Sequence, residues 1–277
     1  MSSPEPRSSS AENPYAPPPR PRPRRKKADA EGGDHEVAAL VARLSSEPEL
    51  TKVERGRVLG SLVKALTTSA RLAGLGAFAG GRWLADTLED TVPRVPNRDA
   101  ETLRSQFRGL PPDDLAQALI NGAAKATAAV GAAGGALAAV EFSAPPTLMS
   151  TPIQIAAETL AIAAIEVKLV AELHEVYGAG LRGPLRSRGL TYLMSWGDRR
   201  GIDPRRPGAL TTTLSLTART QLRRRDLFRA GRTLSTRGPM LTGAALGAAV
   251  NHRETRKLGD QIRRDLRQHN RPSRSWR

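Results

Sequence analysis

The clearest helix signal in the sequence is the stretch PIQIAAETLAIAAIEVKLVAELHEVY, at residues 152–177. Thr151 comes directly before it and is a good N-cap residue. Pro152 suits the first turn of a helix, because the N–H group that proline lacks has no partner there. Gly178 follows the stretch and can end a helix in the left-handed conformation. We therefore expect one long, largely apolar helix over residues 152–177.

Other helix starts are marked by hydroxyl and acidic residues. Asp34 is the expected N-cap of a short helix, and Thr51 and Glu54 have the spacing of a capping box at the start of the next. Asp113 follows two prolines and opens a further helix. Three more helical stretches are expected, at residues 185–196, 210–234 and 241–266. Because no segment predicts a convincing strand pair, the expected fold class is all-α, a multi-helix domain.

Composition divides the chain into three parts. Residues 1–33 are rich in proline, serine and charged residues, so we expect a disordered basic tail that contains a short proline-rich run. The helical domain is expected over residues 34–270, followed by a short basic tail at 271–277. No apolar run follows Met1, so no secretory signal peptide is expected.

The core of this domain must be built from small and aliphatic residues. Aromatic residues make up 4% of the 277 positions and there is no cysteine. The absence of cysteine excludes disulfides and thiolate metal sites. The shortage of aromatic residues argues against a protein that binds single strands by stacking on bases.

The positive charge is concentrated in the last third of the chain. The formal net charge is +16, and residues 182–277 alone hold 23 Lys and Arg against 6 Asp and Glu, whereas the preceding residues are nearly neutral. Such asymmetry indicates an anionic partner. The cations that we expect to bind it are Arg223, Arg224, Arg225, Arg256, Lys257, Arg263 and Arg264.

The last basic stretch also predicts an amphipathic helix. Val250, Leu258, Ile262 and Leu266 can form its apolar side. Such a helix is typical of proteins that bind an anionic membrane surface. A sequence-independent contact with nucleic acid phosphates and a merely solvated helix face both remain open, although no helix-turn-helix pattern or Cys/His finger is present.

Three uncharged segments rich in glycine and alanine contain glycines four positions apart. The segments are 72–81, 126–140 and 238–252, and the glycines are Gly76, Gly80, Gly131, Gly135, Gly243 and Gly247. Small residues at this spacing lie on one helix face and let two backbones approach closely, in lipid or in a soluble core. Each segment is too short to span a bilayer. Residues 126–157 could form a helical hairpin that enters one leaflet, with its turn at Pro145 and Pro146.

Signals for catalysis are weak. Residues 74–79 match a relaxed dinucleotide-binding pattern, but no strand is expected before them. The acidic residues of the 152–177 helix, including Glu158, Glu166 and Glu172, are expected to be solvated or ion-paired, since the Glu-x-x-His pairs of a di-metal site are missing. We expect no enzymatic activity, no metal and no cofactor.

The order of features resembles the EcsC protein family over residues 50–268. A Gly/Ala hairpin leads into the long helix that ends Glu-Val-Tyr-Gly at 175–178, and the run at 238–251, with Gly243, Gly247 and Asn251, continues into the basic helix. The resemblance implies a helical bacterial protein associated with a membrane or with transporter-linked processes. It provides no catalytic residue to carry over.

These observations predict a cytoplasmic protein that is peripheral to the inner face of a membrane and binds anionic lipid through its Arg-rich helices. A nucleic-acid-binding protein is the first alternative. A structural oligomer, in which glycine faces form the subunit contacts, is the second. A homo-oligomer and a membrane-protein partner are both compatible with the sequence.

Overall fold

The computed structural model describes residues 24–46, 50–73, 82–141, 150–201 and 239–269. This part of the chain is 86% helical and contains no strand, so the all-α prediction is confirmed. Its α-helices are α1 (Arg24–Ser46), α2 (Lys52–Ala73), α4 (Arg82–Thr91), α5 (Ala100–Gln106), α6 (Pro112–Glu141), α7 (Ser150–Val176), α8 (Leu185–Arg199) and α10 (Pro239–His269). A short 3-10 helix, η1 (Val92–Arg94), follows α4.

Helix α7 lies at the centre of the fold. Apolar side chains are buried all around it, from Ile153 through Leu160 to Leu173, which is the pattern of a helix covered on every side. It begins one residue before the predicted N-cap and ends as predicted. Gly178 adopts φ +72°, and the N–H of Ala179 donates to the carbonyl of His174 at 2.8 Å, which closes the helix as in a Schellman motif.

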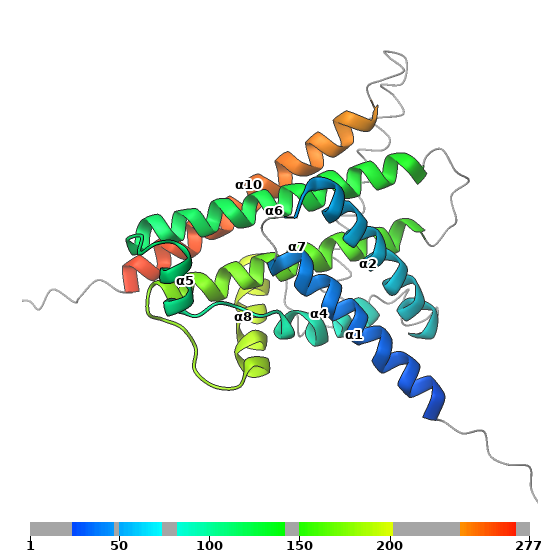
Figure 1. Ribbon diagram of the computed structural model, residues 1–277, viewed down its shortest axis with the longest axis horizontal. Helices are drawn as coiled ribbons and strands as arrows, with labels where there is room; N and C mark the ends of the chain where they lie inside the picture. Colours follow the sequence, from blue (N-terminus) through cyan, green and yellow to red (C-terminus); the bar gives the residue numbers. More distant parts are fainter. Residues whose placement is uncertain (1–23, 47–49, 74–81, 142–149, 202–238, 270–277) are drawn as a thin grey trace, which may run out of the picture.

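Helices α6, α7 and α10 form a three-helix unit in which α6 runs antiparallel to both α7 and α10 (Figure 1). The start of α6 meets the end of α7, where the Tyr177 hydroxyl donates to Asp113 at 2.7 Å. The same end of α6 meets the end of α10, where Arg267 also donates to Asp113. Further along α6, Gln154 of α7 donates to the carbonyl of Gly134 at 2.7 Å.

The other helices cover the remaining sides of α7. Helices α1 and α2 pack on each other and on α7, and α8 packs on α7 and η1 (Figure 1). The predicted capping box is present, because the Glu54 N–H donates to Thr51 Oγ1 at 3.2 Å while the Thr51 N–H donates to Glu54 Oε2 at 2.9 Å. The prediction that Asp34 is an N-cap was wrong, since α1 starts at Arg24 and Asp34 lies inside it. Helices α4 and α5 were not predicted.

Several predictions concern residues outside the described ranges. They include residues 1–23 of the predicted tail, the helix at 210–234 and the turn at Pro145 and Pro146. Residues 24–33, also assigned to the tail, belong to α1 instead. Among the described helices, none combines the length and the apolar content that crossing a bilayer requires.

The backbones of α6 and α10 approach each other closely at Gly131 and Gly247. A Cβ atom added at Gly131 would lie 2.5 Å from Asn251 Nδ2 and 2.7 Å from the Gly247 carbonyl oxygen, and one added at Gly247 would lie 2.8 Å from the Gly131 oxygen. The predicted close packing is therefore present for these two glycines, within one chain. Gly135 is partly buried further along α6, Gly243 lies in α10, and Gly76 and Gly80 lie outside the described ranges.

We expect Gly131→Ala to lower the free energy of unfolding by about 1–3 kcal/mol, because the added methyl group must push α10 away from α6. The matched control is Gly122→Ala in the same helix. Nothing lies within 4 Å of a Cβ atom there, so alanine should stabilise the helix by up to about 1 kcal/mol. Urea unfolding followed by circular dichroism measures both. Equal or greater stability of the Gly131 variant relative to the control would contradict the close approach.

Candidate functional site

The exposed side of α10 carries four cations that we call the basic face: Arg253, Arg256, Lys257 and Arg264. Their spacing places them on one side of the helix. They extend over about 17 Å at 1.5 Å per residue. Within the described ranges none of the four has an ion pair with an acidic side chain. They are therefore available to an anionic partner.

The other predicted cations lie elsewhere. Arg263 is half-buried, donates to Gln117 Oε1 of α6 at 2.6 Å and pairs with Asp260 at 3.2 Å. It joins α10 to α6 and is not part of the basic face. Arg223, Arg224 and Arg225 lie outside the described residues.

The apolar side of α10 is used inside the protein. Leu258 and Ile262 are buried in the core, and Leu266 packs against its edge. Gly259 fits against Ile120 of α6, where an added Cβ atom would lie 2.7 Å from Ile120 Cγ1. Val250 was wrongly assigned to this side, because it is 39% exposed. In this fold, α10 cannot insert its apolar side into lipid while it stays packed on α6.

At one end of the three-helix unit the helix segments contain almost no charged residues, although the carboxylate of Glu158, which follows the α7 segment, packs against Gly134 of α6. This end consists of residues 132–141 of α6, 150–157 of α7 and 239–250 of α10, and we call it the uncharged end. Glu141 is the one charged residue in these three ranges. The three segments lie at the same end of the molecule in Figure 1. The exposed residues of α10 there include Ala245, Ala249 and Val250.

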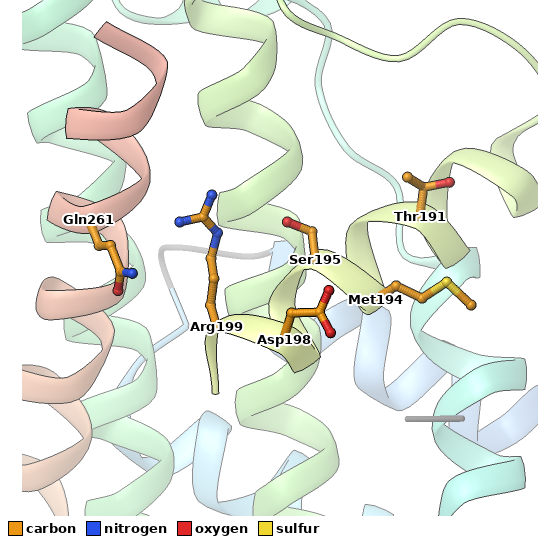
Figure 2. Close-up of a pocket in the computed structure, with 6 residues that line it drawn as sticks. All are labelled: Thr191, Met194, Ser195, Asp198, Arg199 and Gln261. Atoms are coloured by element: carbon orange, nitrogen blue, oxygen red, sulfur yellow. The ribbon is translucent and has the colours of Figure 1, made fainter. Parts of the chain in front are cut away.

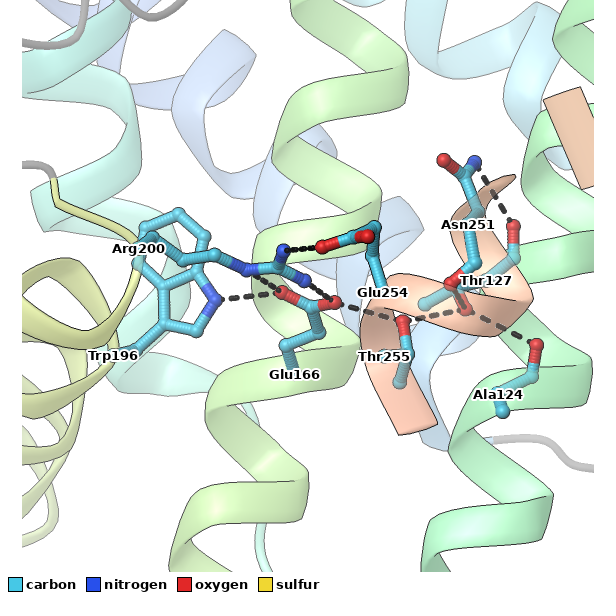
Figure 3. Close-up of polar contacts among 8 residues, drawn as sticks. All are labelled: Ala124, Thr127, Glu166, Trp196, Arg200, Asn251, Glu254 and Thr255. Carbon is cyan, nitrogen blue, oxygen red and sulfur yellow. Dashed lines mark hydrogen bonds and ion pairs between the residues drawn. The ribbon is translucent and has the colours of Figure 1, made fainter. Parts of the chain in front are cut away.

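A buried carboxylate, Glu166 of α7, joins α7 to α8 and α10 (Figure 3). Its side chain is 1% exposed. Trp196 Nε1 donates to Glu166 Oε2 at 2.8 Å, and the Arg200 guanidinium donates to both carboxylate oxygens. Thr255 Oγ1 of α10 donates to Oε1 at 2.7 Å. These donors replace the water that a buried carboxylate loses.

The network continues from Thr255 into α6. Its hydroxyl lies 2.8 Å from Thr127 Oγ1, and both threonines are fully buried. Asn251 Nδ2 donates to the Thr127 carbonyl at 3.3 Å, one turn from the Gly131–Gly247 approach. The close glycines and the polar network thus fix α10 at one position along α6.

A second buried carboxylate, Glu172, fixes the loop before α5. Arg98 donates from Nε and Nη2 to the two oxygens at 2.8 Å each, and Lys168 lies 3.1 Å away. Burial would raise the pKa of Glu172, but the hydrogen bonds from Arg98 and the charges of Lys168 and Arg98 hold it below the usual 4.5. This carboxylate therefore stays ionised inside the fold.

The sequence predicted that the acidic residues of α7 are solvated or ion-paired, and Glu166 and Glu172 are ion-paired. Their burial was not predicted. A signal for it was present, because a charged residue within a helix that is apolar on all sides must be buried and must find partners on neighbouring helices. In the described ranges, His, Asp and Glu side chains form no group that could hold a metal ion.

We expect Glu166→Gln to lower the free energy of unfolding by on the order of 3 kcal/mol, because it leaves the Arg200 charge without its buried partner. Chemical denaturation, followed by the fluorescence of the tryptophans, measures the loss. Glu89→Gln on the exposed side of α4 is the control and should change stability by less than about 0.5 kcal/mol. Equal stability of the two variants would show that the network contributes little.

His174 makes stability depend on pH. Burial lowers the pKa of its imidazole below the usual 6.5, and the hydrogen bond to the Val170 carbonyl opposes this shift only in part. The unfolded chain therefore takes up a proton first as the pH falls through 6.5, and stability decreases with acidification. We expect the free energy of unfolding to fall less with acidification in His174→Gln than in the unchanged protein. Urea unfolding at a series of pH values from 7.5 downward measures this dependence, and the same dependence in both proteins would contradict the role of His174.

Comparisons of the chain with protein-family models, with curated proteins and with solved structures gave no match. The resemblance to the EcsC family therefore stays a prediction. The features that bear on function are the basic face, the uncharged end and the buried network that positions α10.

Proposed function

We propose that this protein associates peripherally with an anionic membrane surface through the basic face of α10. The observation that carries the proposal is the presence of four exposed cations on one side of a helix whose other side is locked into the core. A rigid row of cations presents its charge without first having to order a flexible segment. Near an anionic bilayer each Lys or Arg contributes roughly 1 kcal/mol at low salt.

The uncharged end supports a membrane over a purely aqueous polyanion. It continues α10 beyond the basic face, and its exposed Val250 lies one turn before Arg253. Alanine and valine have little apolar area to bury, so the contact with lipid is shallow and charge contributes most of the binding. This differs from the insertion of an amphipathic helix, which the sequence alone suggested.

The proposed location is the cytoplasmic face of the inner membrane, in agreement with what the EcsC resemblance implies. Binding to nucleic acid is the alternative outcome, since the same cations could neutralise phosphates. Gly131 and Gly247 face each other within one chain, so these two glycines are not free to form a subunit contact.

The test is co-sedimentation with vesicles of phosphatidylglycerol and phosphatidylcholine. We expect a combined variant of the basic face to bind at least about tenfold more weakly at low salt than the unchanged protein. Its substitutions are Arg253→Gln, Arg256→Gln, Lys257→Gln and Arg264→Gln. A charge-matched control replaces exposed cations of α2 and α5 instead: Arg57→Gln, Lys64→Gln, Arg71→Gln and Arg104→Gln.

The control variant should keep most of the binding, and vesicles of phosphatidylcholine alone should bind neither variant. Equal losses in the two variants would show that net charge, and not the basic face, is responsible. Duplex DNA is added as a competitor. If it releases the protein completely and binds it with a steep dependence on log salt, the nucleic-acid alternative replaces this proposal.

A further inference from the structure

An open, shallow pocket of about 570 Å³ lies between α8 and α10 (Figure 2). It is lined by Thr191, Met194, Ser195, Asp198, Arg199 and Gln261. Five of these residues recur at helical spacing along one face of α8, and Gln261 comes from α10. The pocket belongs neither to the buried network nor to the basic face.

The pocket presents groups of opposite charge side by side. The carboxylate of Asp198 and the hydroxyl of Ser195 have no hydrogen-bond or ion-pair partner within the described residues. Arg199 pairs with Asp265 through Nη1 at 2.5 Å, and its side chain is 22% exposed. Figure 2 shows its guanidinium between Gln261 and Ser195. The negatively charged acceptor Asp198 and the positively charged donor Arg199 thus face the same small volume.

We propose that this pocket binds a small zwitterion that carries a primary ammonium group and a phosphate, as in phosphoethanolamine. The ammonium group donates to the Asp198 carboxylate and to the Ser195 hydroxyl. The phosphate accepts from the Arg199 guanidinium and from the Gln261 amide. Both contacts to charged side chains are charge-assisted and therefore strong. Asp198 would repel a simple anion, whereas the ammonium group of a zwitterion balances this carboxylate. Arg199 is bonded to Asp265 through Nη1 alone, so its other N–H groups remain to donate to the phosphate.

The position of the pocket offers two sources for this group. Gln261 lies one turn after Lys257 and one turn before Arg264, so the pocket opens beside the basic face. The source is then either the headgroup of phosphatidylethanolamine or free phosphoethanolamine. The lipid source rests on the proposed membrane association, whereas the soluble source does not.

The first experiment is calorimetric titration of the whole protein with phosphoethanolamine and with phosphocholine. We expect phosphocholine to bind at least about tenfold more weakly, because its trimethylammonium group has no N–H to donate to Asp198. Asp198→Asn should weaken phosphoethanolamine binding by a similar factor. The control Asp114→Asn, at an exposed position of α6, should bind like the unchanged protein. Because Asp198 is also exposed, its variant should unfold at the same urea concentration.

The second experiment uses vesicles with a fixed fraction of phosphatidylglycerol and a remainder of either phosphatidylethanolamine or phosphatidylcholine. Stronger binding with phosphatidylethanolamine, lost in Asp198→Asn, supports the lipid headgroup. Calorimetric binding of phosphoethanolamine without a preference for phosphatidylethanolamine vesicles supports a soluble ligand. No binding to any anionic vesicle contradicts the proposed function but not the proposed pocket ligand. No heat with phosphoethanolamine, equal heat with phosphocholine, or unchanged binding by Asp198→Asn contradicts the proposed pocket ligand.

Discussion

The burial of Glu166 in the middle of α7 is the constraint on which the arrangement of the helices depends. A carboxylate without water must receive hydrogen bonds from its neighbours, and here they come from α8 and α10. Each donor has to approach from its own direction. Helices α8 and α10 are therefore held in position by polar contacts as well as by apolar packing. An all-aliphatic core would leave their register along α7 less well defined.

The position of α10 has a consequence for the surface. Because Gly247, Thr255, Leu258 and Ile262 lie on the side of α10 that packs inside the protein, the four cations of the basic face must face outward together. The burial of one side thus orients the other. The uncharged end arises in the same way from the alanine and glycine residues that let α6, α7 and α10 pack closely. The same pattern of residues along α10 therefore determines both how it packs in the core and which surface it presents.

The sequence predicted local structure better than it predicted contacts between helices. The capping box at Thr51, the end of α7 at Gly178 and the spacing of Gly131 and Gly247 depend on residues near in sequence or on one helix face, and all three are present. The role of Thr255 depends on Glu166, 89 positions away, and no local pattern reveals that pairing. Val250 was misplaced for a related reason, because helical periodicity gives a stripe but does not say how far along it the neighbouring helix covers it.

The pairing of α10 with α6 also bears on how the chain folds. Thr127 and Asn251 meet across 124 positions, so the loop closed by this contact is long and its formation loses much chain entropy. Contacts of such sequence separation slow folding relative to local helix formation. Until α10 docks, Glu166 lacks the hydroxyl of Thr255 and Thr127 lacks its partner. The docking of α10 therefore completes the core and assembles the cationic surface together, so a chain in which α10 is not docked does not present that surface in its final form.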